Sequence, residues 1–190
     1  MRPTIFHLIG MPGVGKYTVA LELARLTDAR MVDNHSIANV IFNVLDVDGI
    51  KPLPVGTFRR VSQVRAAVLD TLVNLSPAHL SFVFTNVLIG EDEREMAVFR
   101  EIADAAEARN SVFVPVILSC ETGELVRRIV RPDRKARMKL IDPVEGARLN
   151  DRVPQFRSDH PNTLELDTSR TTPAEAAQII VEWRDRLGDG

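Results

Sequence analysis

A glycine-rich stretch near the start of the chain, GMPGVGKYT at residues 10–18, has the composition and spacing of a phosphate-binding loop. It satisfies G-x-x-x-x-G-K and lies between an apolar run and a helical pattern, which is the context that this motif requires. Its glycines permit turns in which successive backbone N–H groups converge on one anion, and Lys16 adds a cation for the β- and γ-phosphates. A tight turn without a ligand would not need a lysine directly after the third glycine. We therefore expect phosphate contacts from Gly10, Met11, Pro12, Gly13, Val14, Gly15, Lys16, Tyr17 and Thr18.

Tyr17 departs from the pattern, because the residue after the lysine usually carries a small hydroxyl that binds Mg²⁺. A phenol oxygen lies too far from the backbone to reach the same point. Thr18, one position later, is therefore the candidate metal ligand of the loop, directly or through a metal-bound water. For Tyr17 we favour a role in covering the nucleotide, or in packing on the neighbouring helix, over a role in catalysis.

The composition is that of an ordinary globular protein. Of the 190 residues, 45% are hydrophobic and 26% are charged, which is enough apolar material for one domain with a substantial core over residues 1–190. A net charge of −2 gives no reason to expect nucleic acid or an anionic membrane as a partner. The single cysteine, Cys120, excludes an intramolecular disulfide and a cysteine-based metal site. The apolar run at the N-terminus is too short for a signal peptide or a membrane span, so the cytoplasm is the expected compartment.

Apolar runs alternate with helical patterns along the chain. This alternation, with nearly continuous apolar strands, is typical of an α/β fold in which helices cover both faces of a parallel sheet. Pro115 lies inside the fourth apolar run and removes a hydrogen-bond donor, so that strand is expected near an edge or with a bulge. Residues 46–56 are predicted to form a loop, and residues 131–157 a basic, irregular segment. The predicted strands are residues 4–9, 31–33, 80–89, 112–118 and 163–166, and the predicted helices are residues 16–26, 37–45, 58–75, 91–109, 121–130 and 173–187.

The loop GMPGVGKYT resembles those of the small P-loop kinases, namely the adenylate, shikimate and gluconate kinases and chloramphenicol phosphotransferase. The adenylate kinases also lack a hydroxyl directly after the lysine and have threonine next. The segment TLELDTSRTTPAEAAQII at 163–180 resembles their last strand, adenine-side loop and final helix, which implies that Ser169 and Arg170 lie beside the nucleotide. The resemblance implies ATP and Mg²⁺ as cofactors. It also implies a three-layer αβα architecture, the P-loop NTPase fold, with a five-stranded parallel sheet in the order 2-3-1-4-5.

Basic residues crowd the thirteen positions from 127 to 139. The stretch ELVRRIV at 124–130 resembles the helix that brings arginines to the nucleotide in these kinases, and the basic segment after it resembles their lid. Phosphoryl transfer spreads negative charge over the moving group, and cations opposite the loop would stabilise that charge and exclude water. The resemblance places Arg128 near the adenine and Arg131 or Arg134 on the phosphates. The alternative is a solvated basic face or an RNA-binding patch. The basic residues are Arg127, Arg128, Arg131, Arg134, Lys135, Arg137 and Lys139.

The stretch MVDNHSI at 31–37 ends the predicted second strand, at the place where shikimate kinases carry Asp-x-Asp. The resemblance implies that Asp33 serves the metal or the acceptor. His35 replaces the second carboxylate, and an imidazole can accept a hydroxyl proton near neutral pH. The alternative for His35 is a helix-entry residue that hydrogen-bonds to the backbone.

The stretch GTFRR at 56–60 resembles the segment by which shikimate kinases hold an acidic acceptor, so Arg59 and Arg60 are candidate acceptor ligands within an acceptor-binding segment at 35–75. Arg65 follows at a spacing by which one or two of these three arginines are expected to face the cleft. Two departures argue against shikimate itself. Ser62 stands in place of the expected glutamate, and the third strand ends FTNVLIG, without a triple glycine or a metal-binding aspartate. Asn86 in that stretch is expected to bind the acceptor or to orient a water, or else to cap the next turn.

Together these residues predict a phosphotransferase that moves the γ-phosphate of Mg-ATP to a hydroxyl of a small-molecule acceptor, in a monomer or a homodimer. The sequence does not name the acceptor. The missing loop hydroxyl and third-strand aspartate support a second hypothesis, a nucleotide-binding regulatory protein or an NTPase with little transfer activity. A third hypothesis is an RNA-binding NTPase that uses the basic segment.

Overall fold

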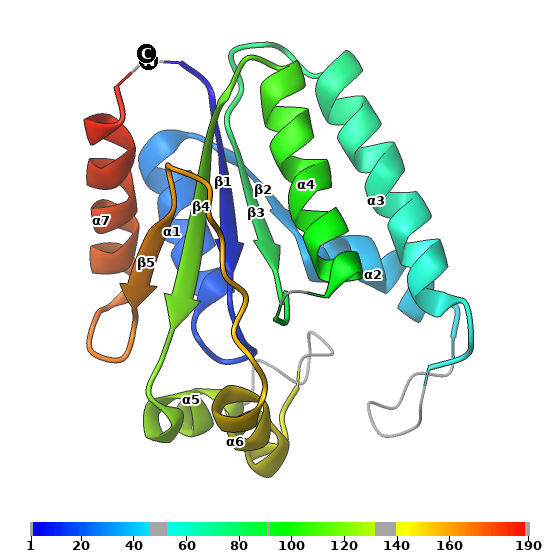
Figure 1. Cartoon of the computed structure of the whole chain (residues 1–190), viewed down its shortest axis with the longest axis vertical. Coiled ribbons are helices and arrows are strands. Elements are labelled where there is room, and N and C mark those ends of the chain that lie inside the picture. Colours follow the sequence, from blue (N-terminus) through cyan, green and yellow to red (C-terminus); the bar gives the residue numbers. More distant parts are fainter. Residues whose placement is uncertain (1, 46–52, 91, 132–139, 189–190) are drawn as a thin grey trace.

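A computed structural model describes residues 2–45, 53–90, 92–131 and 140–188. Its centre is a sheet of five strands in the order β2-β3-β1-β4-β5, which confirms the predicted topology (Figure 1). Every neighbouring pair in this sheet is parallel, as predicted. The strands are β1 (Thr4–Ile9), β2 (Arg30–Asp33), β3 (Phe82–Asn86), β4 (Val112–Ser119) and β5 (Leu164–Asp167).

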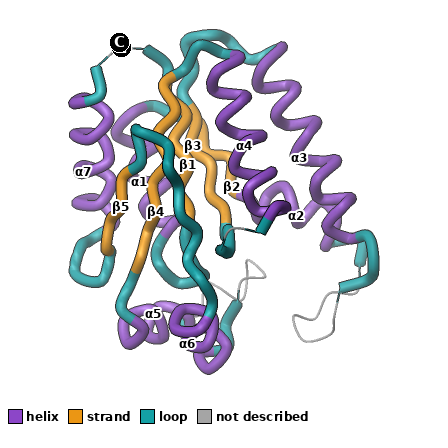
Figure 2. The backbone as a smooth tube through the Cα atoms, in the orientation of Figure 1, coloured by secondary structure: helices purple, strands orange, loops and turns teal. Residues whose placement is uncertain are grey.

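Helices cover both faces of the sheet, as the alternating patterns predict (Figure 2). On one face lie α1 (Lys16–Thr27) and α7 (Pro173–Arg186), and on the other lie α3 (Thr57–Asn74) and α4 (Glu93–Ala108). The remaining helices lie toward the end of the sheet at which the strand arrows point; they are α2 (Asn34–Phe42), α5 (Thr122–Ile129) and α6 (Pro143–Arg152). None of the helices in the described ranges is long and apolar enough to cross a membrane.

Strand β1 contributes to both hydrophobic cores, because successive side chains of a strand point to opposite faces. Phe6 and Leu8 pack in the core beneath α1 and α7, whereas Ile5 and Ile9 pack in the core beneath α3 and α4. All four are inaccessible to solvent or nearly so. Burial of side chains of this size stabilises a fold by about 1.5–3 kcal/mol each. The strand is therefore firmly held, and so is the point at which the glycine-rich loop begins.

The segment from 131 to 157 is not irregular throughout, because it contains α6. The side chain of Asp142 accepts hydrogen bonds from the backbone N–H groups of Val144 and Glu145, and a proline occupies the first turn. This Asp-Pro pair is a helix-start signal that the basic composition of the segment obscured. Gly146 then lets α6 pack closely on α5, since an added Cβ would lie 2.2 Å from Cδ1 of Ile129.

Strand β4 is the second strand from an edge of the sheet, which confirms the expectation, drawn from Pro115, of a strand near an edge. Pro115 lies opposite His7 of β1, and pairing with β5 begins one residue later, at Val116. The carbonyl of Phe113 accepts a hydrogen bond from the side chain of Asn162, on the β5 side of the strand. Because backbone groups alternate sides along a strand, Pro115 also directs its nitrogen toward that side, just before the β5 ladder starts. The proline is tolerated there because it interrupts no backbone ladder.

Candidate functional site

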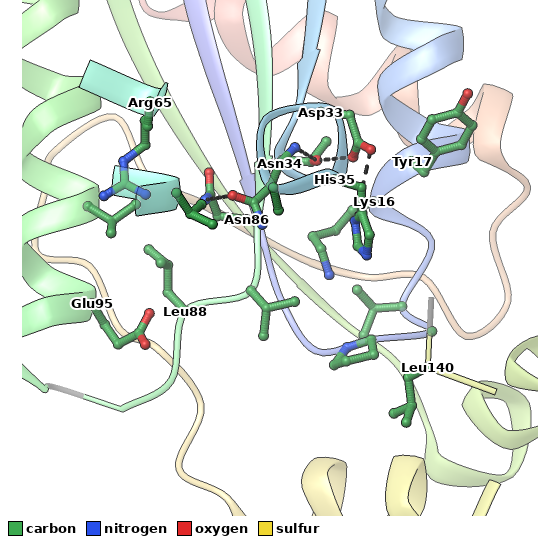
Figure 3. A pocket seen from close by; sticks show the side chains of 18 of the residues that line it. Lys16, Tyr17, Asp33, Asn34, His35, Arg65, Asn86, Leu88, Glu95 and Leu140 are labelled. Carbon is green, nitrogen blue, oxygen red and sulfur yellow. Dashed lines mark hydrogen bonds and ion pairs between the residues drawn. The ribbon is translucent and has the colours of Figure 1, made fainter. Parts of the chain in front are cut away.

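A cavity of about 1410 Å³ opens at the carboxyl ends of the strands, where ligands bind in open α/β sheets. Its described lining includes the loop after β1, the ends of β2 and β3, the segment after β5, and parts of helices α2, α3, α4, α5 and α7. These segments are far apart in the sequence, and the parallel sheet brings them together. Figure 3 shows the side chains of Lys16, Asp33, Asn86 and Glu95 around this space.

The glycine-rich loop has the strand–loop–helix geometry that its sequence predicts. It leaves β1 at Ile9 and enters α1 at Lys16, and no side chain of the described residues caps the helix at Gly15. The N–H groups of the first helical turn are therefore available to an anion, at the positive end of the helix. Gly10 lies against β4, where an added Cβ would be 2.3 Å from the carbonyl oxygen of Leu118. Only glycine fits at this position.

The ammonium group of Lys16 lies at the mouth of the loop. Its Nζ donates hydrogen bonds to the carbonyl oxygens of Gly10 at 2.6 Å and Met11 at 2.9 Å. Thr18 donates from Oγ1 to the carbonyl oxygen of Gly15 at 2.9 Å, and both Tyr17 and Thr18 line the cavity. In Figure 3 the hydroxyl of Tyr17 points away from the Lys16 ammonium group. This orientation agrees with the expectation that the phenol does not take the place of the usual metal-binding hydroxyl.

Thr168 and Arg128 connect the loop to the segment after β5. Thr168 is buried and donates from Oγ1 to the carbonyl oxygen of Val14 at 2.7 Å. Arg128 donates to the carbonyl oxygens of Thr168 at 2.7 Å and Val14 at 3.3 Å, and pairs with Glu124 at 2.7 Å. These bonds use the edges of the planar guanidinium group, so a base can stack on its face without breaking them. The pairing with Arg128 also lowers the pKa of Glu124.

The segment after β5, for which the sequence predicted contacts with the nucleotide, lines the cavity with other residues than those expected. Ser169 and Arg170 do not line the cavity, whereas the neighbouring Thr168 and Thr171 do. Ser169 accepts a hydrogen bond from the backbone N–H of Glu121, and exposed Arg170 lies 3.9 Å from the Glu121 carboxylate. Sequence reasoning missed Thr168, although the run of hydroxyl residues DTSRTT is the signal that could have indicated it.

Asp33 lies at the end of β2, beside the end of β3. Its Oδ1 accepts a hydrogen bond from Oγ1 of Thr85 at 2.6 Å, and its Oδ2 lies 3.9 Å from Nδ1 of His35 in the first turn of α2. Asp33 is only 9% exposed, yet it lines the cavity together with His35. The structure thus brings together the two residues that the sequence proposed for this end of β2. The contact with Thr85 fixes the orientation of the carboxylate.

Asn86 also lines the cavity, and its side chain belongs to a buried polar network that the sequence did not predict. Its Oδ1 lies 3.0 Å from Nε2 of His7, and its Nδ2 donates to Oδ1 of Asn34 at 3.2 Å. Its backbone carbonyl accepts from the N–H of Gly10, the first residue of the loop. His7 is fully buried, and burial is the main reason that its pKa is lowered to about 3. A histidine inside the apolar run TIFHLI was the available signal.

The other arginines proposed from the sequence lie in different surroundings. Arg59 and Arg131 are exposed at the cavity wall. Arg60 does not line this cavity and bonds to Gln63 instead. Arg65, which the sequence singled out less strongly, lines the cavity and is only 8% exposed. Arg134 and the basic residues at 135, 137 and 139 lie outside the described residues.

The donor set fits a magnesium ion held mainly by a nucleotide. Within the described ranges, no group of three or more His, Cys, Asp or Glu side chains is arranged to hold a metal ion. Mg²⁺ is usually bound through one or two carboxylates together with substrate phosphates and waters, so a full protein cage is not needed. Asp33 supplies a carboxylate at the cavity wall, and Thr18 supplies a hydroxyl beside the phosphate loop.

The chain resembles solved kinases over nearly its whole length. A gluconokinase from Sinorhizobium meliloti is 14% identical with a TM-score of 0.66, and the match covers 98% of this chain and 94% of that one. A sugar kinase from Janibacter is 15% identical with a TM-score of 0.59, with coverages of 96% and 95%. The APS kinase of Mycobacterium tuberculosis, solved with AMPPNP and APS, is 15% identical with a TM-score of 0.56, with coverages of 97% and 98%.

These matches confirm the predicted fold class. The three-layer αβα arrangement and the strand order are those of the P-loop kinases. No protein-family model matches the sequence, and neither does any curated protein. At these low identities the likeness establishes the fold, and the chemistry has to be argued from the residues around the cavity.

Proposed function

We propose that the protein is a phosphotransferase, which moves the γ-phosphoryl group of Mg-ATP to a hydroxyl of a small-molecule acceptor. The observation that carries this proposal is that the Lys16 loop and the Asp33–His35 pair line one cavity. The Lys16 loop provides a site for the polyphosphate, and the Asp33–His35 pair provides groups that can accept a proton. A cavity that only bound a nucleotide would not need proton acceptors opposite the loop.

The transfer step assigns a role to each group. The acceptor oxygen forms a bond to the γ-phosphorus, while the bond from that phosphorus to the β,γ-bridging oxygen breaks and ADP leaves. The acceptor proton passes to Oδ2 of Asp33 or to the imidazole of His35, since Oδ1 of Asp33 already accepts a bond from Thr85. Lys16 and Arg131 stabilise the charge on the moving group, and Arg134 is proposed to join them.

Asp33 and Thr18 are the residues that would hold Mg²⁺. When bound, the ion neutralises charge on the β- and γ-phosphate oxygens. Arg128 would lie beside the adenine, between α5 and the segment after β5. Asn86 and Arg59 would contact the acceptor. In this proposal Arg60 has no direct contact with the acceptor, because its side chain lies outside the cavity lining.

One observation favours a second function. Tyr17 leaves the loop without the usual metal-binding hydroxyl, and Asn86 stands at the end of β3 where a metal-binding aspartate was expected. A nucleotide-binding regulatory protein would need neither group. Such a protein would bind ATP through the same loop but transfer phosphate slowly or not at all.

The release of ADP distinguishes these functions. The purified chain is incubated with Mg-ATP alone and with a panel of sugars, sugar acids, amino alcohols and hydroxylated antibiotics. A phosphotransferase releases ADP faster with at least one acceptor than without any, and Lys16→Ala abolishes that release. Arg25→Ala is the matched control, because Arg25 is another cation of α1 that pairs with Glu22 on the surface. Normal ATP binding without acceleration by any acceptor would favour the regulatory protein.

A further inference from the structure

The part of the cavity between α3 and α4 contains charged groups that the transfer step does not use. Arg65 of α3 is one of them, and its positive charge is compensated by neighbouring residues of the cavity wall. Its Nε donates to Oε2 of Glu101 at 2.7 Å, and its Nη2 donates to Oγ of Ser62 at 3.1 Å. An arginine that is buried and already paired with a carboxylate offers little to a second carboxylate from a ligand.

Glu95 of α4 is in the opposite situation. Its carboxylate points from the helix into the cavity, across the space from Lys16 (Figure 3). It accepts a hydrogen bond from the backbone of Ile89, and it has no ion-pair partner among the described residues. Burial, and secondly the neighbouring Asp92, raise the pKa of Glu95 above its usual value. The charge of Arg65 and the hydrogen bond from Ile89 act in the opposite direction without cancelling these two causes, so the protein compensates the negative charge of Glu95 only in part.

We propose that the acceptor is a hydroxyl compound that carries a protonated amine, and that Glu95 binds this ammonium group. The inference rests on the function proposed above and names the substrate class of the same site. An ammonium ion supplies an ion-pair partner, which Glu95 lacks among the described residues, and adds hydrogen-bond donors to the one from Ile89. With its amine at Glu95, the acceptor extends across the cavity and presents its hydroxyl to Asp33 and the phosphate loop.

The other groups near Glu95 agree with this assignment. Leu88 and Val98 also line this part of the cavity, and Phe58, which is 69% exposed, lies at its wall. These apolar side chains offer a contact surface for the apolar part of a ligand. A small, highly charged sugar acid has no such part. Arg59 and Arg94 line the cavity too, but both are exposed to solvent, where an ion pair with a carboxylate contributes little.

Matched ligands test the proposal by direct binding. Isothermal titration with the nucleotide-loaded chain compares 6-amino-6-deoxyglucose, glucose and glucuronate, and then phenylethanolamine, phenylethanediol and mandelate. Each set holds one scaffold and changes an amine to a neutral group and to a carboxylate. The expected result is that the amine of at least one set binds at least about tenfold more tightly than its two counterparts, because only the amine forms a charged hydrogen bond with Glu95.

A pair of variants then locates the amine. Glu95→Gln should remove most of the tenfold preference. Glu93→Gln is the matched control, because Glu93 lies in the same helix turn but is exposed and pairs with Arg100. Equal or tighter binding of the acids, the absence of any preference for amines, or an amine preference that survives Glu95→Gln would each overturn the proposal.

The same samples separate this proposal from the function on which it rests. Amines that bind through Glu95 but never accelerate ADP release would count against phosphoryl transfer and leave the ligand class standing. If sugar acids accelerate ADP release, and the Glu95→Gln variant releases ADP at the same rate, phosphoryl transfer is established and the amine is rejected as the acceptor class.

Discussion

Nε2 of His7, in the middle of β1, lies 3.0 Å from Oδ1 of Asn86 at the end of β3. Because Nδ2 of Asn86 donates to Asn34, Oδ1 of Asn86 is the acceptor, and the neutral imidazole must carry its proton on Nε2. Nδ1 of His7 then faces the core, where it has no hydrogen-bond partner among the described residues. A core histidine thus determines how an amide at the cavity wall is oriented.

This buried imidazole should make the fold sensitive to mild acid. The pKa of His7 is about 3 in the folded chain and about 6.5 in the unfolded chain, so the unfolded state binds the extra proton first as the pH falls. Stability is therefore lost progressively below pH ~6.5, by about 2 kcal/mol at pH ~5 from this group alone. His7→Gln keeps an amide that can donate to Asn86 and removes the titration. Urea unfolding of both proteins across this range should give a shallower pH dependence for the variant, and superimposable pH dependences would contradict the assignment.

Thr168→Val should loosen the phosphate loop. The substitution keeps the shape of the side chain and removes the bond from Oγ1 to the carbonyl oxygen of Val14. We expect a loss of about 1–3 kcal/mol in unfolding free energy, because the hydroxyl loses its hydrogen bonds with both Val14 and Arg128. We also expect several-fold weaker ATP binding by titration calorimetry. Thr71→Val is the control, since that exposed hydroxyl bonds only within α3; an equal effect on ATP binding from both variants would show that the loop contact is unimportant.

Tyr17→Ser should increase the dependence of nucleotide binding on magnesium. The serine places a hydroxyl directly after Lys16, where Tyr17 cannot place one. The ATP dissociation constant, measured against Mg²⁺ concentration, should fall more steeply in the variant than in the natural protein. Tyr17→Phe removes the phenol without adding a ligand and should behave like the natural protein. If Tyr17→Ser gives the same Mg²⁺ titration as the natural protein and Tyr17→Phe, the missing hydroxyl does not limit metal binding.

His35→Gln and Asp33→Asn test which group takes the acceptor proton. Removal of a positioned proton acceptor usually costs about 10²–10⁴ in rate. The variant that removes the base should lose that much in kcat with an active acceptor, while its ATP affinity stays unchanged. Asp33→Asn is expected to weaken Mg²⁺ binding as well, which His35→Gln should not. An unchanged rate in His35→Gln would make the imidazole a structural neighbour of Asp33.

The residues that could be predicted from the sequence are those whose signal is local. Pro3 and Gly10 bound an apolar run, and β1 begins and ends where that run does. The glycines and Lys16 likewise predict the loop that joins β1 to α1. The ion pair of Arg65 could not be found in this way, because its partner Glu101 lies 36 residues away on another helix.

Other residues of the site are recognised only by their contacts with residues far away in the sequence, which the spacing of residue types does not reveal. Thr168 bonds to Val14 across 154 residues, and His7 bonds to Asn86 across 79. The order of the strands determines both contacts. A sequence pattern could mark such residues only as polar side chains in unexpected places.

The contact of Gly10 with β4 has a consequence for the energetics of anion binding. Because the Gly10 backbone is wedged against the carbonyl of Leu118, the start of the turn acquires its shape when the sheet assembles. The conformational entropy of ordering this part of the turn is then lost during folding, before any ligand arrives. A preorganised turn of this kind binds its ligand at a smaller entropic cost than a turn that must order on contact.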